Sequence, residues 1–359
     1  SGGLDVDGVT DLDVVDIDGA VNMATTLLVT GNVDFNGDLD VDGTSNLDVI
    51  DVDGAANFAA DVTFADGADI ITASAGTSNV RVGVNAGNSI ASGGNYNTVV
   101  GDDAGTAITT SINNTAVGWQ ALTANTTGDS STAVGLQALA TATTSNSNSA
   151  FGTEALKYNT TGFRNSAFGG RDYDNGASSY GTLNLNTTGS YNSAFGQGAL
   201  ANNTTASQNN AVGYQAGYSN TTGSSNNIIG WRSGYANSIG TNNTFIGNTA
   251  GYSTTSSYNT FVGRDSGYYV TSGQKNTIIG AYTGNQGGLD IRTANNHVIL
   301  SDGDGNVRFK VIANGVTFLP GVYNNTTAEA ANVVAYSGGG GDMYRSTSAL
   351  KYKQDIRDV

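Results

Sequence analysis

The chain of 359 residues contains 51 glycines, one proline, 17 tyrosines, 11 phenylalanines and no cysteine, and only 12% of its side chains are charged. This composition favours turns and strands and predicts an all-β protein, and the lack of cysteine excludes disulfides and thiolate metal sites. The net charge of −16 argues against a surface that binds phosphate backbones, so no nucleic-acid partner is expected. No segment approaches the ~20 consecutive apolar residues of a membrane-spanning helix, so membrane insertion is not expected.

The N-terminal segment, residues 1–75, is predicted to be an acidic stem with an internal repeat. It holds 16 of the 30 acidic residues in its first 70 positions, and the sequence of 4–31 recurs 35 residues later at 39–67. Apolar residues alternate with aspartates in both copies, a period of two that is typical of strands with one buried and one solvated face. Such narrow strands need other chains to cover their apolar face, and we expect three chains around one axis.

Aspartates beside glycine occur in this stem at 16–19 and 51–54. Clustered carboxylates suit hard cations such as Ca²⁺, and cation binding is therefore one interpretation. A helix-loop-helix calcium site needs further ligands and a bidentate glutamate, whereas the chain has only Glu154 and Glu329. Ordinary turn aspartates are the preferred interpretation, and no metal ion or other cofactor is expected.

Residues 79–284 repeat one phrase twelve times, an Asn or Ser followed by a small residue, two apolar residues and a glycine. The steps between successive repeat glycines are 18, 17, 17, 17, 17, 27, 17, 17, 17, 16 and 17 residues. The repeat glycines are Gly83, Gly101, Gly118, Gly135, Gly152, Gly169, Gly196, Gly213, Gly230, Gly247, Gly263 and Gly280. The single long step is one unit that carries an insertion near 170–180.

Each repeat unit is predicted to form one coil of a β-solenoid. The apolar pair is β-branched or aromatic in many units, which suits a strand, and the following glycine permits a turn. Runs of the type Asn-Thr-Thr-Gly, as at 125–128, 159–162 and 220–223, supply further turns. A period this short excludes a globular enzyme built on one compact core, because each unit buries its apolar residues only against its neighbours.

Two of the units also carry a family resemblance. The sequence Asn-Ser-Ala-Phe-Gly occurs at 148–152 and 192–196. It is similar to the NSVAIG-like phrase in the heads of trimeric autotransporter adhesins. This resemblance implies a β-roll and a homotrimer, although the period here is longer. Handedness, and whether each coil belongs to one chain or is shared by three, stay open.

One interpretation of the insertion is a binding site for a host glycan or receptor, because binding residues of solenoids often lie on inserted loops. Aromatic and arginine side chains can stack on sugar rings or contact carboxylated glycans. The candidate binding residues are Arg171, Asp172, Tyr173, Asp174 and Tyr180. An ordinary surface loop is the preferred interpretation.

Paired carboxylates raise a second possibility, cleavage of a polysaccharide, which needs two such groups facing one glycosidic bond. The available pairs are Asp102 with Asp103 and Asp172 with Asp174. Aromatic residues in the later units form either an exposed ladder for glycans or stacks that pack on one another or between subunits. They are Trp119, Tyr214, Trp231, Tyr218, Tyr235, Tyr252 and Tyr268.

Beyond the repeats, residues 285–341 are predicted to form a connector of β-hairpins. Apolar runs at 298–300, 307–311 and 316–319 read as short strands, and Asp302-Gly303 and Asn314-Gly315 separate them as turns.

The last segment, residues 342–359, carries a motif of Ser348, Lys353 and Ile356. It resembles the start of the intramolecular chaperone domain at the C-terminus of phage tail fibres and endosialidase tailspikes. The resemblance implies that the domain helps three chains to fold and then cuts itself off between Thr347 and Ser348. A desolvated lysine such as Lys353 loses its proton more readily and can activate a serine hydroxyl. Cleavage is expected only with the continuation of that domain beyond Val359.

The sequence therefore predicts an all-β homotrimeric fibre with β-solenoid repeats of about 17 residues, as a β-roll or a β-helix. We expect a phage tail fibre or virion appendage, extracellular and not an enzyme apart from self-cleavage. Its expected partners are two further copies of itself, the virion or tail base, and a host surface glycan or receptor. The alternatives are a trimeric adhesin on a bacterial surface and a polysaccharide depolymerase tailspike.

Overall fold

The computed structural model describes residues 74–171, 180–318, 333–335 and 343–345. The chain divides into two units, Ser1–Ala68 and Asp69–Val359, and the described residues belong to the second. The predicted stem, except its last two residues, therefore lies outside the described residues. Asp172, Tyr173 and Asp174 of the insertion and the motif residues Ser348 and Lys353 also lie outside them.

The described residues form strands, turns and loops, with no helix among them. The strands are β1 Val80–Val82, β2 Thr98–Val100, β3 Thr115–Val117, β4 Thr132–Val134, β5 Ser149–Phe151, β6 Ser166–Phe168, β7 Ser193–Phe195, β8 Asn210–Val212, β9 Asn227–Ile229, β10 Thr244–Ile246, β11 Thr260–Val262, β12 Thr277–Ile279, β13 Asn285–Gln286, β14 Leu289–Asp290, β15 Val298–Ser301, β16 Val307–Val311, β17 Thr317–Phe318, β18 Val333–Ala335 and β19 Met343–Arg345. The prediction of an all-β protein is confirmed for this part of the chain.

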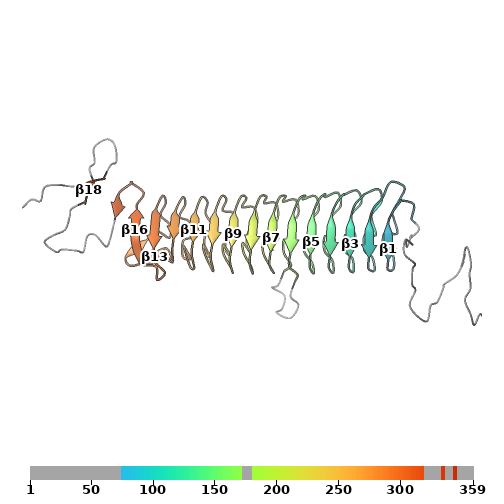
Figure 1. Cartoon of the computed structure of the whole chain (residues 1–359), viewed down its shortest axis with the longest axis horizontal. Helices are drawn as coiled ribbons and strands as arrows, with labels where there is room; N and C mark the ends of the chain where they lie inside the picture. Colours follow the sequence, from blue (N-terminus) through green and yellow to red (C-terminus); the bar gives the residue numbers. More distant parts are fainter. Residues whose placement is uncertain (1–73, 172–179, 319–332, 336–342, 346–359) are drawn as a thin grey trace, which may run out of the picture. The chain divides into compact units, whose positions relative to one another are not determined.

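The strands stack as the coils of a β-solenoid (Figure 1). Strands β1 to β12 pair in chain order, all parallel, and Thr115 of β3 lies beside Thr132 of β4, its equivalent in the next repeat. The predicted insertion lengthens a single step, so that Ser166 pairs with Ser193 of the next coil. The coils are wound within one chain, which answers a question that the sequence left open.

The solenoid core lies on the inner side of this sheet. The middle residue of each strand from β2 to β12, and the second residue of β15, points inward and is fully buried. These residues are Val99, Ala116, Ala133, Ala150, Ala167, Ala194, Ala211, Ile228, Phe245, Phe261, Ile278 and Ile299. Side chains of this type stabilise the stack by about 25 cal/mol for each Å² of apolar surface removed from water.

The two sides of the core are complementary in size. Coils with alanine on the strand carry a buried leucine six residues later in the simplest cases, as Ala150 does with Leu156. Coils with phenylalanine on the strand carry glycine at that place, and a Cβ on Gly267 would lie 2.5 Å from Cδ2 of Phe261. In these coils a large residue on one side of the core faces a small one on the other, so the core width is similar although the individual residues change.

Two backbone features close each coil. Gly118, which follows β3, has φ +125, and a Cβ there would lie 2.8 Å from the carbonyl carbon of Gly135 in the next coil. The residue that begins each repeat, Asn in every unit except that of Ser131, is buried and links neighbouring coils. The Asn209 backbone N–H donates to Oδ1 of Asn192 at 3.0 Å, and Nδ2 of Asn209 donates to the Gly223 carbonyl at 2.9 Å. These bonds satisfy polar groups that would be costly to bury alone.

The parallel stack continues one coil beyond the predicted shaft. Strand β15 pairs parallel with β12, Thr277 beside Val298, and the short hairpin of β13 and β14 makes this coil longer than the others. Strands β16 and β17 then add antiparallel to the same sheet. The three short strands expected after Gly284 occur at the predicted places, and the first of them belongs to the solenoid.

The size complementarity predicts a mutational rescue. Gly267→Leu overpacks the core against Phe261 and should cost about 1–3 kcal/mol, and Phe261→Ala leaves a cavity and should cost about 3–5 kcal/mol. The double variant recreates the pairing of Ala150 with Leu156. Its loss of unfolding free energy should therefore be smaller than the sum of the two single losses, by more than about 1 kcal/mol. Urea unfolding followed by circular dichroism measures the three values, and additive losses would contradict the core packing described here.

Candidate binding surface

An apolar stripe runs along the outward side of the solenoid sheet. The last residue of strands β1 to β12, and Leu300 in β15, is apolar, points away from the core and is half-buried or exposed. The stripe consists of Val82, Val100, Val117, Val134, Phe151, Phe168, Phe195, Val212, Ile229, Ile246, Val262, Ile279 and Leu300. Phe195 is 41% and Ile279 is 47% exposed. With neighbouring strands ~4.8 Å apart, the stripe is about 60 Å long.

The rings within this stripe stack along the sheet. Phe168 lies between Phe151 and Phe195, with ring centroids 4.7 and 4.8 Å apart and planes within 8° of parallel. From β2 to β12, the first residue of each strand also points outward and is Thr, Ser or Asn, as in Ser149, Ser166 and Asn210. One edge of the outer face is therefore apolar and the other is polar.

A tyrosine ladder follows a different line on the surface. Tyr218, Tyr235, Tyr252 and Tyr268 stack with centroids 5.3, 5.1 and 4.9 Å apart. Burial, and then the neighbouring tyrosines, raise the pKa of Tyr218 and of Tyr268. Because each ring covers the face of the next, the ladder cannot offer its ring faces to a flat ligand along its length.

The insertion is held at its two described ends. Tyr180 lies against Tyr218, with ring centroids 6.5 Å apart and planes tilted by 32°. The coil between the two tyrosines has Gly198, whose missing side chain leaves space for their contact. A shallow hollow at this place is lined by Tyr180, Gly198, Tyr214 and Tyr218. Tyr180 thereby continues the ladder from the insertion.

At the other end, Arg171 donates to Oε2 of Glu154 at 3.0 Å, and Lys157 donates to Oε1 of the same carboxylate at 2.9 Å. Burial of Glu154 opposes its ionisation and raises its pKa, but the hydrogen bonds and charges of both cations outweigh that effect and lower it overall. Arg171 is therefore part of an ion-pair cluster at the base of the insertion.

The remaining carboxylate pair within the described residues is built into the coils. Oδ1 of Asp102 accepts the Val84 backbone N–H at 3.0 Å, and Oδ1 of Asp103 accepts Nδ2 of Asn85 at 3.1 Å. Each aspartate thus links its coil to the preceding one. These bonds give both carboxylates a structural role between coils.

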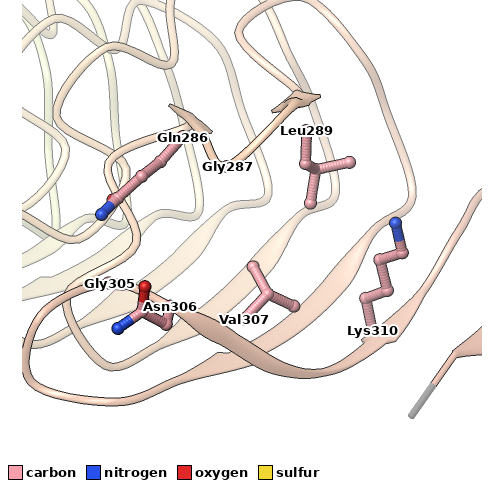
Figure 2. Close-up of a pocket in the computed structure, with 7 residues that line it drawn as sticks. All are labelled: Gln286, Gly287, Leu289, Gly305, Asn306, Val307 and Lys310. Carbon is pink, nitrogen blue, oxygen red and sulfur yellow. The ribbon is translucent and has the colours of Figure 1, made fainter. Parts of the chain in front are cut away.

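A cavity of about 380 Å³ lies near the end of the solenoid, between the β13–β14 hairpin and β16 (Figure 2). Leu289 and Val307 face each other across it, and Lys310 stands at its edge with Nζ 4.6 Å from the Phe318 ring centroid. The Tyr282 hydroxyl donates to the Leu289 carbonyl at 2.6 Å and fixes the hairpin, and burial raises the Tyr282 pKa. No acidic side chain of the described residues lines this cavity.

Exposed aromatic residues also lie beside the ladder. Tyr214 and Trp231 stack with centroids 6.4 Å apart, and the Arg232 guanidinium lies 4.8 Å from the Trp231 ring. The neighbouring coils add Asn248, Arg264 and Asp265, none of which was predicted from the sequence. The place after the repeat glycine differs from unit to unit, so no sequence signal singles these residues out.

Within the described ranges, no helix is long and apolar enough to cross a membrane, and no three His, Asp or Glu side chains are grouped to hold a metal ion. No protein-family model, no curated protein and no solved structure matches the chain. The function is therefore inferred from the surfaces described above and from the motifs in the sequence.

Proposed function

We propose that the protein is a homotrimeric structural fibre of a phage tail or a similar virion appendage, which attaches the particle to its host. The observation that carries this proposal is the apolar stripe. Monomeric soluble proteins rarely expose a contiguous apolar patch larger than a few hundred Å². A stripe that recurs at every coil from Val82 to Leu300 therefore suits an interface along the whole solenoid.

Three copies around one axis account for the geometry of this stripe. Each solenoid turns the same face to the axis, so the stripes meet along a central seam and form a closed assembly with no free apolar face. The stacked rings of Phe151, Phe168 and Phe195 lie at the middle of such a seam. The resemblance of the Asn-Ser-Ala-Phe-Gly phrases to trimeric adhesin heads supports the same number of chains.

The virion assignment rests on the motif of Ser348, Lys353 and Ile356, which resembles the start of the self-cleaving chaperone domain of phage fibres. A chaperone that assembles three chains is consistent with the seam. A trimeric adhesin on a bacterial surface is the second candidate, because the Asn-Ser-Ala-Phe-Gly phrases at 148–152 and 192–196 favour it. In both cases the protein is a binding and structural molecule that acts outside the cell.

The seam predicts that a charge in the stripe separates the chains. Phe168→Asp places a carboxylate at the centre of three apolar surfaces, where its burial costs several kcal/mol for each chain. Light scattering coupled to size exclusion should give the mass of three chains for the native protein and a lower mass for Phe168→Asp. The matched control is Tyr258→Asp, because Tyr258 is 55% exposed and lies off the stripe. A native mass of one chain would refute the trimer.

The terminal motif predicts processing when the complete gene product is made. The native product should yield a chain that ends at Thr347, because Ser348 attacks the carbonyl before it. A Ser348→Ala version should remain uncut, since it lacks the hydroxyl nucleophile. Intact-mass spectrometry distinguishes the two. Uncut chains in both would remove the support for the chaperone and favour the cell-surface adhesin.

A further inference from the structure

The ring of Trp231 has two different environments on its two sides. Towards the preceding coil it stacks on Tyr214, with planes 18° apart. Towards the following coil its register neighbour is Asn248, because Ile229 pairs with Ile246 two residues earlier in each coil. Asn248 is short and exposed, and among the described residues no second aromatic ring stacks on this side. Trp231 is 45% exposed, which leaves part of its ring accessible to a ligand.

Polar groups that bond to one another follow Trp231 in the next two coils. The Thr249 hydroxyl is hydrogen-bonded to the Asp265 carboxylate and lies 3.3 Å from Oδ1 of Asn248. The other carboxylate oxygen of Asp265 accepts Nε of Arg264 at 3.0 Å. The Arg264 side chain is exposed. Coils are ~4.8 Å apart, so these groups lie within about 10 Å of the indole ring along the solenoid.

This combination fits the two kinds of surface on a pyranose sugar. A hexose ring has a face of C–H groups, which pack on the electron-rich face of an indole. Its hydroxyls at the rim need donors and acceptors, and an amide, a guanidinium and a carboxylate supply both. All these groups are attached to a hydrogen-bonded solenoid. Binding of a ligand therefore costs little backbone conformational entropy.

The charges favour a neutral sugar. Arg264 is paired with Asp265, so the pair carries no net charge that would select a carboxylated sugar. Arg232 is oriented the other way, where Nε donates to Oε1 of Gln215 at 2.8 Å in the preceding coil. The guanidinium of Arg232 therefore supports the ring from the side of Tyr214 and does not complete an anion site on the open face.

We propose that Trp231, Asn248, Arg264 and Asp265 form a binding site for a neutral hexopyranose unit of a surface polysaccharide. The sugar stacks on the open face of Trp231, and its hydroxyls bond to the amide of Asn248 and to the Arg264–Asp265 pair. The site gives the proposed attachment function a ligand class and a location distinct from the insertion. The proposed site depends on the proposed attachment function only for the biological source of the polysaccharide, which would be the host surface.

The experiment uses the assembled protein and two soluble neutral polymers, galactomannan and dextran, which together present mannose, galactose and glucose. Trp119→Phe leaves Trp231 as the only tryptophan, so its fluorescence should change on titration with one of the polymers. Affinity electrophoresis in gels containing the same polymers measures retardation. Trp231→Ala should lower the affinity at least about tenfold, because it removes the stacking surface. Arg264→Ala should also weaken binding.

Trp119→Ala is the matched control. Trp119 is 46% exposed and also follows a repeat glycine, but Leu136 stands where Asn248 stands beside Trp231. This control should retain the native affinity. The proposal is overturned if neither polymer binds, if Trp119→Ala and Trp231→Ala lose affinity equally, or if only the acidic polymer polygalacturonate binds.

Light scattering on each sample gives the number of chains in the assembly. Failure of the sugar site can therefore be distinguished from failure of the proposed trimeric fibre. A trimer without polymer binding refutes the sugar site and leaves the fibre. A single chain that binds the polymer through Trp231 refutes the trimer and leaves the site.

Discussion

The whole solenoid depends on one constraint, the parallel register that places each residue beside its equivalent in the next coil. Thr115 pairs with Thr132, and Thr132 pairs with Ser149, at a constant step along the chain. A coil of this size buries no core by itself, so its stability comes from its two neighbours. The buried asparagines, the similar core width, the apolar stripe and the tyrosine ladder all follow from repeating a side chain every ~4.8 Å.

The same constraint explains why the solenoid uses so few charges. Equivalent residues stack directly, so a charged residue in the repeat would lie close to a like charge in the next coil and destabilise the stack. Asparagine and threonine avoid this cost because they are neutral and can donate and accept along the stack. Where ionised groups do occur in the described coils they are often paired, as Glu154 is with Lys157 and Arg171, and Arg264 with Asp265.

Much of this architecture could be predicted from the sequence, because a repeat period fixes the coil. The glycine after each strand and the turn at each Asn-Thr-Thr-Gly run were sufficient to predict stacked coils of one repeat each. The added coil of β15 was not predicted, since its longer step hides the period. The apolar stripe could also have been predicted from the sequence, because two successive apolar residues on a strand point to opposite faces of the sheet. Phe245 and Ile246 are such a pair.

The candidate sites were harder to predict, because they depend on what the neighbouring coils leave uncovered. Tyr180 was selected as a binding residue in the insertion, and the structure shows its ring lying against Tyr218. The open face of Trp231 depends on Asn248 in the next coil. Nothing in the sequence of its own repeat unit marks Asn248 as a functional residue. Only the comparison of side chains across coils distinguishes Trp231 from Trp119, although both follow a repeat glycine and have nearly the same exposure.

The central claim is that the apolar stripe is buried by other copies of the chain, and hydroxyl-radical footprinting of the assembled protein tests it most directly. Peptide mass spectrometry would compare Phe151, Phe168 and Phe195 on the stripe with Tyr191 and Tyr258, which are exposed off it. We expect the three phenylalanines to be protected while both tyrosines are oxidised. Oxidation of the phenylalanines to the extent expected from their exposure in a single chain would contradict the claim.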